Sequence, residues 1–187
     1  MEQINPRSRS DQYGSRINRA HSPLLVNGLP VVSIILGSIV PAFLLTSAIP
    51  FMPPLGFLML LAWRIVRPGL LPVWVGLPLG MVDDLFSGQP FGSAILLWSL
   101  AMIAIELIDV RFPWRTFLQD WLAISAIIAA YLLIGALFSG APIRATILFA
   151  LIPQFLICVL IFPMISRMIA RLDRLRLRRF KSVGVSV

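Results

Sequence analysis

The sequence lacks most of the side chains from which enzymes build active sites. Its 187 residues include one cysteine (Cys158), one histidine (His21) and one lysine (Lys181). His21 lies in the polar N-terminal stretch and Cys158 in an apolar run, so neither a disulfide framework nor a thiolate or imidazole metal site can be assembled. A glycine-rich phosphate loop followed by lysine is missing as well. We therefore expect no catalytic residue, no metal and no cofactor.

Charge is also scarce. Charged residues make up 13% of the chain and hydrophobic residues 58%, with a mean hydropathy of +0.90. Soluble domains carry roughly 25% charged residues. No polar segment between the termini is long enough for a soluble domain. This composition predicts an all-α integral membrane protein with one membrane domain and a polar tail at each end.

Six apolar segments predict six transmembrane helices. They cover residues 29–49, 51–66, 70–86, 91–108, 117–138 and 145–165. A hydrocarbon core of about 30 Å needs roughly 20 helical residues. The second and third segments are shorter and rich in proline and glycine, so we expect short or broken helices there. Pro41 is expected to interrupt the first segment.

The basic residues predict the orientation and the domain limits. When both termini are placed in the cytoplasm, all of the 16 arginine and lysine residues except Arg144 belong to cytoplasmic segments, as the positive-inside rule requires. Asp83 and Asp84 then lie at the non-cytoplasmic side. The expected organisation is a cytoplasmic tail over 1–28, a six-span domain over 29–166 and a basic cytoplasmic tail over 167–187.

The net charge of +8 therefore indicates topology and anionic lipid as a partner rather than nucleic acid. Residues 166–181 combine arginines with apolar residues at helical spacing, among them Met168, Ile169, Leu172 and Leu175. Two interpretations stay open for this tail. It lies on anionic lipid through its apolar face, or it extends the last span and acts as an orientation signal.

Tryptophans are expected both at the membrane boundary and in the core. Trp63, Trp114 and Trp121 flank the predicted cytoplasmic ends of spans, where amphipathic rings are common. Trp74 and Trp98 lie deeper and are expected to pack inside the bundle.

Two carboxylates, Glu106 and Asp109, are one helical turn apart near Arg111 and Arg115. We interpret them as members of ion pairs at a helix end, because carboxylates near a membrane usually pair locally when a base is close. The alternative is a coupling site for a transported cation.

Asp83 and Asp84 are the only adjacent acids in the chain, within the stretch GMVDDLFSGQPFG of residues 80–92. They resemble the start of a DDxxD magnesium-diphosphate motif, but the fifth position is Ser87. A two-aspartate protease would need a further aspartate at the same depth, and the other acids near spans lie at the opposite side.

The same stretch has a four-residue repeat formed by Gly80, Asp84, Gly88 and Gly92. On a helix, glycines four apart share a face and permit close approach of a neighbouring helix. Gly88 and Pro90 end a helix, so the repeat is expected to cover a helix end, a turn and the next helix start. Because the C-terminal end of a helix disfavours negative charge, Asp84 is expected to accept hydrogen bonds from free N–H groups of the next helix.

Residues 67–74 (RPGLLPVW), together with this repeat, resemble MreD, a family of rod shape-determining membrane proteins of bacteria. The resemblance spans about residues 29–170 and includes the chain length, six spans and basic cytoplasmic ends. A structural or partner-binding role is expected for Arg67, Pro68, Pro72, Gly80, Asp83, Asp84, Gly88, Pro90 and Gly92. The family's acid matches Asp84, and the adjacent Asp83 leaves open which of the two carries a role.

The resemblance implies a non-enzymatic scaffold of the cell-elongation complex in the bacterial inner membrane. Its partners would be MreC, whose single membrane helix packs on small-residue faces of the bundle, and indirectly the MreB-like filament, RodA and its transpeptidase. The family's fold is similar to that of S-components of energy-coupling vitamin transporters, which implies a cavity opening toward Asp84. The alternative functions are therefore binding or transport of a small molecule or lipid and, less favoured, an enzyme on lipid-linked phosphates.

Overall fold

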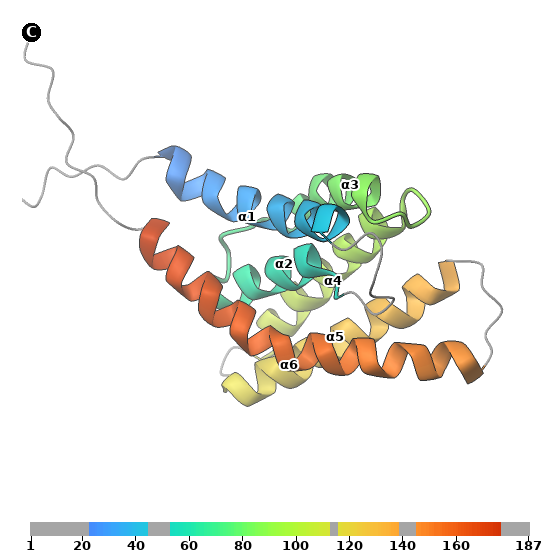
Figure 1. The fold of residues 1–187 in the computed structure, drawn as a ribbon. Coiled ribbons are helices and arrows are strands. Elements are labelled where there is room, and N and C mark those ends of the chain that lie inside the picture. Colours follow the sequence, from blue (N-terminus) through green and yellow to red (C-terminus); the bar gives the residue numbers. More distant parts are fainter. Residues whose placement is uncertain (1–22, 45–52, 113–115, 139–144, 177–187) are drawn as a thin grey trace, which may run out of the picture.

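The computed structural model describes residues 23–44, 53–112, 116–138 and 145–176. Within these ranges the regular structure is entirely helical, which confirms the predicted all-α class (Figure 1). The elements are α1 (Pro23–Leu44), α2 (Leu55–Val66), the 3₁₀ turn η2 (Val73–Val75), α3 (Gly76–Phe86), α4 (Ser93–Arg111), α5 (Phe117–Phe138) and α6 (Ala145–Arg176).

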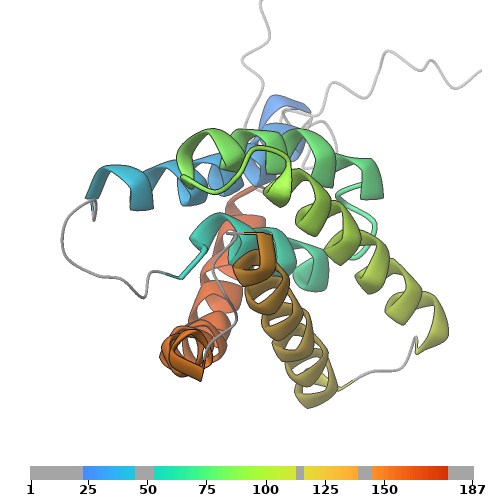
Figure 2. The same cartoon turned by 90° about the vertical axis from the view of Figure 1, so that its right-hand side faces the viewer.

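The short helix α2 lies at the centre of the bundle, and the other helices surround it (Figure 2). Contacts run round this ring from α1 to α3, α4, α5 and α6 and back to α1, while α2 packs against α1, α4 and α6. The twelve residues of α2 span about 18 Å, which is less than the hydrocarbon thickness. Burial among other helices explains why so short a helix is tolerated, since protein rather than lipid meets its ends.

Aromatic rings fill the space beside α2. Phe57 and Trp98 are fully buried, with ring centroids 5.9 Å apart, and Tyr131 of α5 stacks on Phe57 at 4.2 Å. Stacked and tilted pairs at these distances contribute beyond the area that they bury. The core is therefore anchored where α2, α4 and α5 meet.

Within the described ranges, three helices are long and apolar enough to cross a membrane: Ser93–Arg111, Phe117–Phe138 and the part of α6 over Leu151–Leu175. The apolar parts of α1 and α2 are shorter. Outward-facing positions are apolar too, since Leu107 and Val110 of α4 are 65% and 76% exposed. A helix that is apolar all round is typical of a membrane span. The protein is thus an integral membrane protein, while six crossings and cytoplasmic termini stay predictions.

The predicted segments agree with the helices to different degrees. The fourth and fifth segments correspond to α4 and α5, and the second and third are short, as expected. The expected interruption at Pro41 is wrong, because α1 continues through this residue to Leu44. A proline removes one hydrogen bond, but packing of α1 against α2 and α3 keeps the helix in place.

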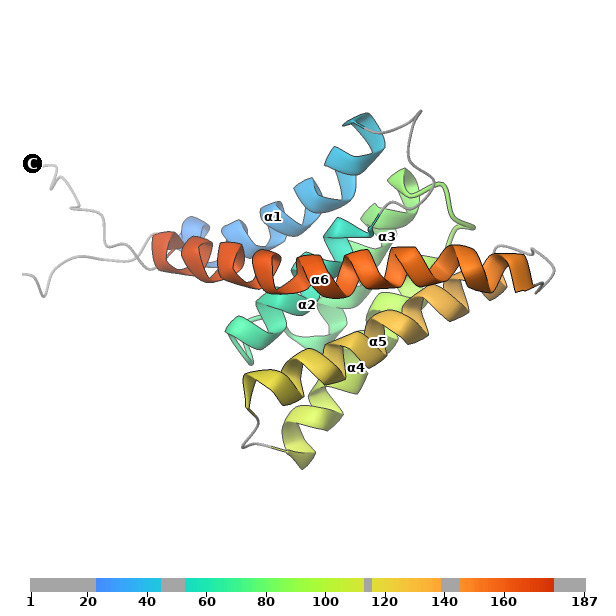
Figure 3. The same cartoon turned by 60° about the horizontal axis from the view of Figure 1, so that its bottom comes forward.

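The last helix is longer than the predicted span. α6 passes through Pro153 and Pro163 to Arg176 and runs the length of the bundle (Figure 3). Its last turns are not solely a surface segment, because Ile169 and Asp173 are buried. This part of the tail therefore extends the sixth helix, and the domain limits at 28/29 and 166/167 stay predictions.

The tryptophans depart from expectation. Trp63, predicted at the membrane boundary, is fully buried, and its Nε1–H donates to Ser33 Oγ at 2.8 Å. Trp74, predicted in the core, is 65% exposed, whereas Trp98 is buried as predicted. Trp114 lies outside the described residues. The reason is tertiary: α2 is enclosed on all sides, so a residue near its end does not reach the boundary.

Candidate functional site

The junction between α3 and α4 is organised around the Asp84 carboxylate. Oδ2 accepts from the N–H of Gly92 at 2.9 Å and of Ile95 at 3.3 Å, and Oδ1 accepts from the N–H of Ala94 at 2.8 Å. The Ser93 hydroxyl lies 3.3 Å from Oδ1 and 3.2 Å from Gln89 Oε1. The predicted acceptance of N–H groups from the next helix is therefore confirmed.

This arrangement solves a problem of helix α4. The first N–H groups of a helix have no partner inside it, and the N-cap of α4 is Gly92, which has no side chain to supply one. Asp84 provides the acceptor from the preceding helix. Its negative charge also lies at the positive end of the α4 dipole, which offsets the unfavourable position near the C-terminal end of α3.

Gly80 permits close contact between α3 and α4. A Cβ atom at this position would lie 2.7 Å from the Ala94 carbonyl oxygen and 2.8 Å from Ile95 Cα. Both are backbone atoms and cannot rotate away. Gly76, one turn earlier, meets the backbone of Ser99 at 3.1 Å in the same way. The two helices are thus joined through a glycine face, as predicted for small residues in membrane bundles.

The other two glycines of the repeat have a different role. Gly88 and Gly92 have φ angles of +68° and +98°, and an added Cβ would meet no atom within 4 Å. Positive φ is readily adopted by glycine alone. The prediction of a helix end, turn and helix start is correct, but only Gly80 of the three glycines serves helix packing.

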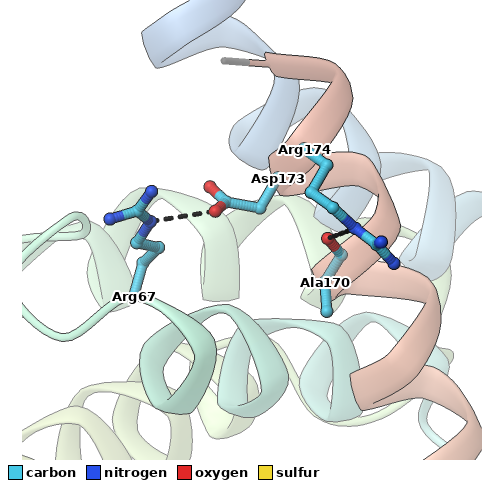
Figure 4. Close-up of polar contacts among 4 residues, drawn as sticks. All are labelled: Arg67, Ala170, Asp173 and Arg174. Carbon is cyan, nitrogen blue, oxygen red and sulfur yellow. Dashed lines mark hydrogen bonds and ion pairs between the residues drawn. The ribbon is translucent and has the colours of Figure 1, made fainter. Parts of the chain in front are cut away.

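A second group of predicted residues lies between α2 and η2. Arg67 is the C-cap of α2, Pro68 is exposed in the turn, and Pro72 is the N-cap of η2. The Arg67 Nε–H donates to Asp173 Oδ2 of α6 at 2.9 Å (Figure 4). Asp173 has no predicted role in the sequence analysis, because its partner lies on a distant segment of the chain.

An ion-pair cluster lies near this group. Arg64 of α2 has only 3% of its side chain exposed, and it pairs with Glu106 and, at 3.7 Å, with Asp109, both of α4. The prediction that these acids form ion pairs is confirmed, but Arg64 supplies the charge instead of a neighbour on α4. From the sequence alone, Arg64 indicates only the membrane orientation.

Replacing Arg64 by methionine is expected to lower the free energy of unfolding by about 2 kcal/mol. This is below the roughly 3–5 kcal/mol for breaking a fully buried pair, because Glu106 is 48% exposed and can turn to water. Adding Glu106→Gln should regain part of the loss, since it removes the uncompensated charge. Thermal unfolding in detergent checks both, with the exposed Arg111→Met as control. A double variant no more stable than Arg64→Met alone would contradict this role.

A cavity of about 460 Å³ lies at the other end of α2. Asp83, Ser38, Tyr131 and Gln154 are among its lining residues. The resemblance implied a cavity opening toward Asp84, but the carboxylate that lines the cavity is Asp83. The two adjacent acids are thus separated in role: Asp84 holds the helix junction and Asp83 faces the cavity.

The predicted site residues therefore do not form one site. Arg67, Pro68 and Pro72 lie at the end of the bundle where α2 ends, whereas the six residues from Gly80 to Gly92 lie at the end of α3, near where α2 begins. Among the described residues, no three His, Cys, Asp or Glu side chains come together as metal ligands.

The fold and these contacts define a class: an all-helical integral membrane protein in which polar contacts of Asp84, Arg64 and Arg67 join one helix to another. The family model for rod shape-determining protein MreD matches residues 22–171, which includes nearly all of the helical bundle. The chain belongs to the MreD family. Searches of curated proteins and of solved structures gave no match.

Proposed function

We propose that this protein is a non-enzymatic membrane scaffold of the bacterial cell-elongation complex, and that it binds a single-span MreC-like protein. Membership of the MreD family implies a role in determining rod shape. The observation that carries the proposal is the extent of the match, which begins one residue before α1 and ends within α6. The match covers the bundle as a whole rather than a local motif.

The proposed location is the bacterial inner membrane with both termini in the cytoplasm. Two observations support this orientation. The start of α1 and the end of α6 lie at the same end of the bundle (Figures 1 and 3). Arg64 and Arg67 are joined at this end to acids of α4 and α6. Exposed Arg167, Arg171 and Arg174 on α6 are suited to anionic headgroups.

The partner helix is proposed to pack on small residues that the bundle itself does not use. Four glycines of α1, α2 and α3 are occupied by contacts inside the bundle: Gly37, Gly56, Gly76 and Gly80 each have a neighbouring helix within 3.2 Å of an added Cβ. Ala126 and Ala130 of α5 are instead exposed and four residues apart, so they share a face. Through the MreC-like protein the scaffold would connect to the MreB-like filament, RodA and its transpeptidase.

Capture from membranes of a rod-shaped host tests the proposal. The tagged protein is expected to co-purify with an MreC-like single-span protein, and its depletion should give rounded cells. The Ala126→Leu/Ala130→Leu variant should reduce the captured partner about tenfold, because added methylenes separate packed helices. Ala104→Leu is the matched control, because Ala104 of α4 is a half-buried alanine on a different helix. Normal rods after depletion and no captured partner would together contradict the scaffold.

A further inference from the structure

The cavity at the start of α2 has features that the scaffold role does not explain. It is partly open and lies between the ends of α1, α3 and α5 and the starts of α2 and α6. Pro41, Leu132 and Leu151 contribute apolar walls, and Ser38 and Asp83 contribute polar groups. Its volume of about 460 Å³ lies in the range of about 300–1,000 Å³ that is usual for small-molecule sites.

Two polar groups of the cavity, from Ser38 and Asp83, are buried side by side. Ser38 is 8% exposed, and the neighbour that its Oγ faces among the described residues is the Asp83 carboxylate. Asp83, 7% exposed, lies beside this hydroxyl. A hydroxyl beside a buried carboxylate can donate to it and still accept, but the carboxylate requires a counter-charge. That cost is removed if a ligand supplies donors and positive charge.

The described residues place no such charge beside Asp83. Asp84 acts on it electrostatically, but it adds negative charge and is occupied by the N–H groups of α4. Tyr131, which also interacts with Asp83, carries no positive charge in either of its protonation states. Arg64 lies near the opposite end of α2, eight residues after the cavity-lining Gly56, and is paired with Glu106. The cavity is thus electronegative at its buried end.

We propose that this cavity binds a primary ammonium group, held by the Asp83 carboxylate and the Ser38 hydroxyl. An ammonium has three N–H donors and no acceptor, which matches two buried acceptors and a negative charge. A quaternary choline carries the same charge but has no N–H to donate. The ammonium belongs either to a lipid headgroup, whose chain would follow Leu132 and Leu151, or to a free amine. This site is independent of the proposed binding of a partner helix.

Titration of the full-length protein in maltoside detergent tests this inference. The probes are lysophosphatidylethanolamine and lysophosphatidylcholine with identical chains, and native mass spectrometry gives each dissociation constant. Lysophosphatidylethanolamine is expected to bind at least about tenfold more tightly than lysophosphatidylcholine, because the choline headgroup cannot form the charge-assisted hydrogen bonds. In the Asp83→Asn variant, the ethanolamine lipid should bind only about as tightly as the choline lipid. Spermidine added as a competitor distinguishes a free amine, which displaces the lysolipid, from a headgroup site, where it does not.

A second variant covers the case in which Asp83→Asn fails to fold. Gly135 lines the cavity, and an added Cβ would meet no atom within 4 Å, so Gly135→Leu fills the space without a backbone clash and should abolish binding. Gly28→Leu is the matched control, since Gly28 is equally unobstructed in α1 and does not line the cavity. Equal binding of the two lysolipids, or unchanged ethanolamine binding in Gly135→Leu, would overturn the proposal.

Discussion

Replacing Asp84 by alanine is expected to lower the melting temperature of the detergent-solubilised protein by about 10 °C. The substitution removes the acceptor for the N–H groups of Gly92, Ala94 and Ile95 at once. Ala94 is fully buried, so its N–H cannot form a hydrogen bond with water instead. Leaving buried donors unpaired costs about 1–3 kcal/mol each, which makes a total loss of about 3 kcal/mol a conservative expectation.

Asp84→Asn separates the acceptor role from the charge. Asparagine keeps one carbonyl oxygen at the start of α4 and loses the second oxygen and the favourable interaction with the helix dipole. We expect its melting temperature to lie between those of Asp84→Ala and the wild-type protein. Asp120→Asn on α5 removes an acid away from this junction and serves as the control. If Asp84→Ala has the same melting temperature as the wild-type protein, the carboxylate does not stabilise this junction.

Adding a single methyl group at Gly80 is expected to destabilise the protein by about 2 kcal/mol. The new Cβ would lie 2.7 Å from the carbonyl oxygen of Ala94, so α3 and α4 must move apart. The movement would also stretch the hydrogen bonds of Asp84, which depend on the same helix spacing. Thermal unfolding of Gly80→Ala, with folded yield after extraction, measures the effect.

Gly135→Ala is the matched control for Gly80→Ala. Both glycines are inside helices, and alanine is the better helix former by about 1 kcal/mol. The Cβ at Gly135 meets no atom within 4 Å, so this variant should be as stable as the wild type or slightly more so. Equal effects of the two substitutions would show that helix propensity, not contact between α3 and α4, determines the result.

These contacts describe how a membrane bundle with two short helices is held together. Hydrophobic burial does not drive association between helices in lipid, so close backbone contact and polar pairs become decisive. At one end Asp84 and Gly80 join α3 to α4. At the other, Arg64 and Arg67 connect α2 to α4 and α6. The proposed scaffold role would require such rigidity, because a partner helix needs a fixed surface.

Much of the fold could be predicted from the sequence because its signals are local. Apolar segments of about 20 residues indicated α4 and α5 with their approximate ends, and clusters of proline and glycine indicated the short second and third helices. The Asp84 contacts were also predictable, since donor and acceptor are at most 11 residues apart and helix ends have known requirements.

By itself, then, the sequence determined the helical class, the short helices and the polar junction at Asp84. Only the tertiary structure decided which charges pair, that Trp63 is buried, and that Asp83 faces a cavity while Asp84 does not. Arg67 and Asp173 are 106 residues apart, and their contact depends on α6 returning past the end of α2. Helix formation follows from the spacing of nearby residues, whereas these pairings depend on which helix faces meet when the ring closes around α2.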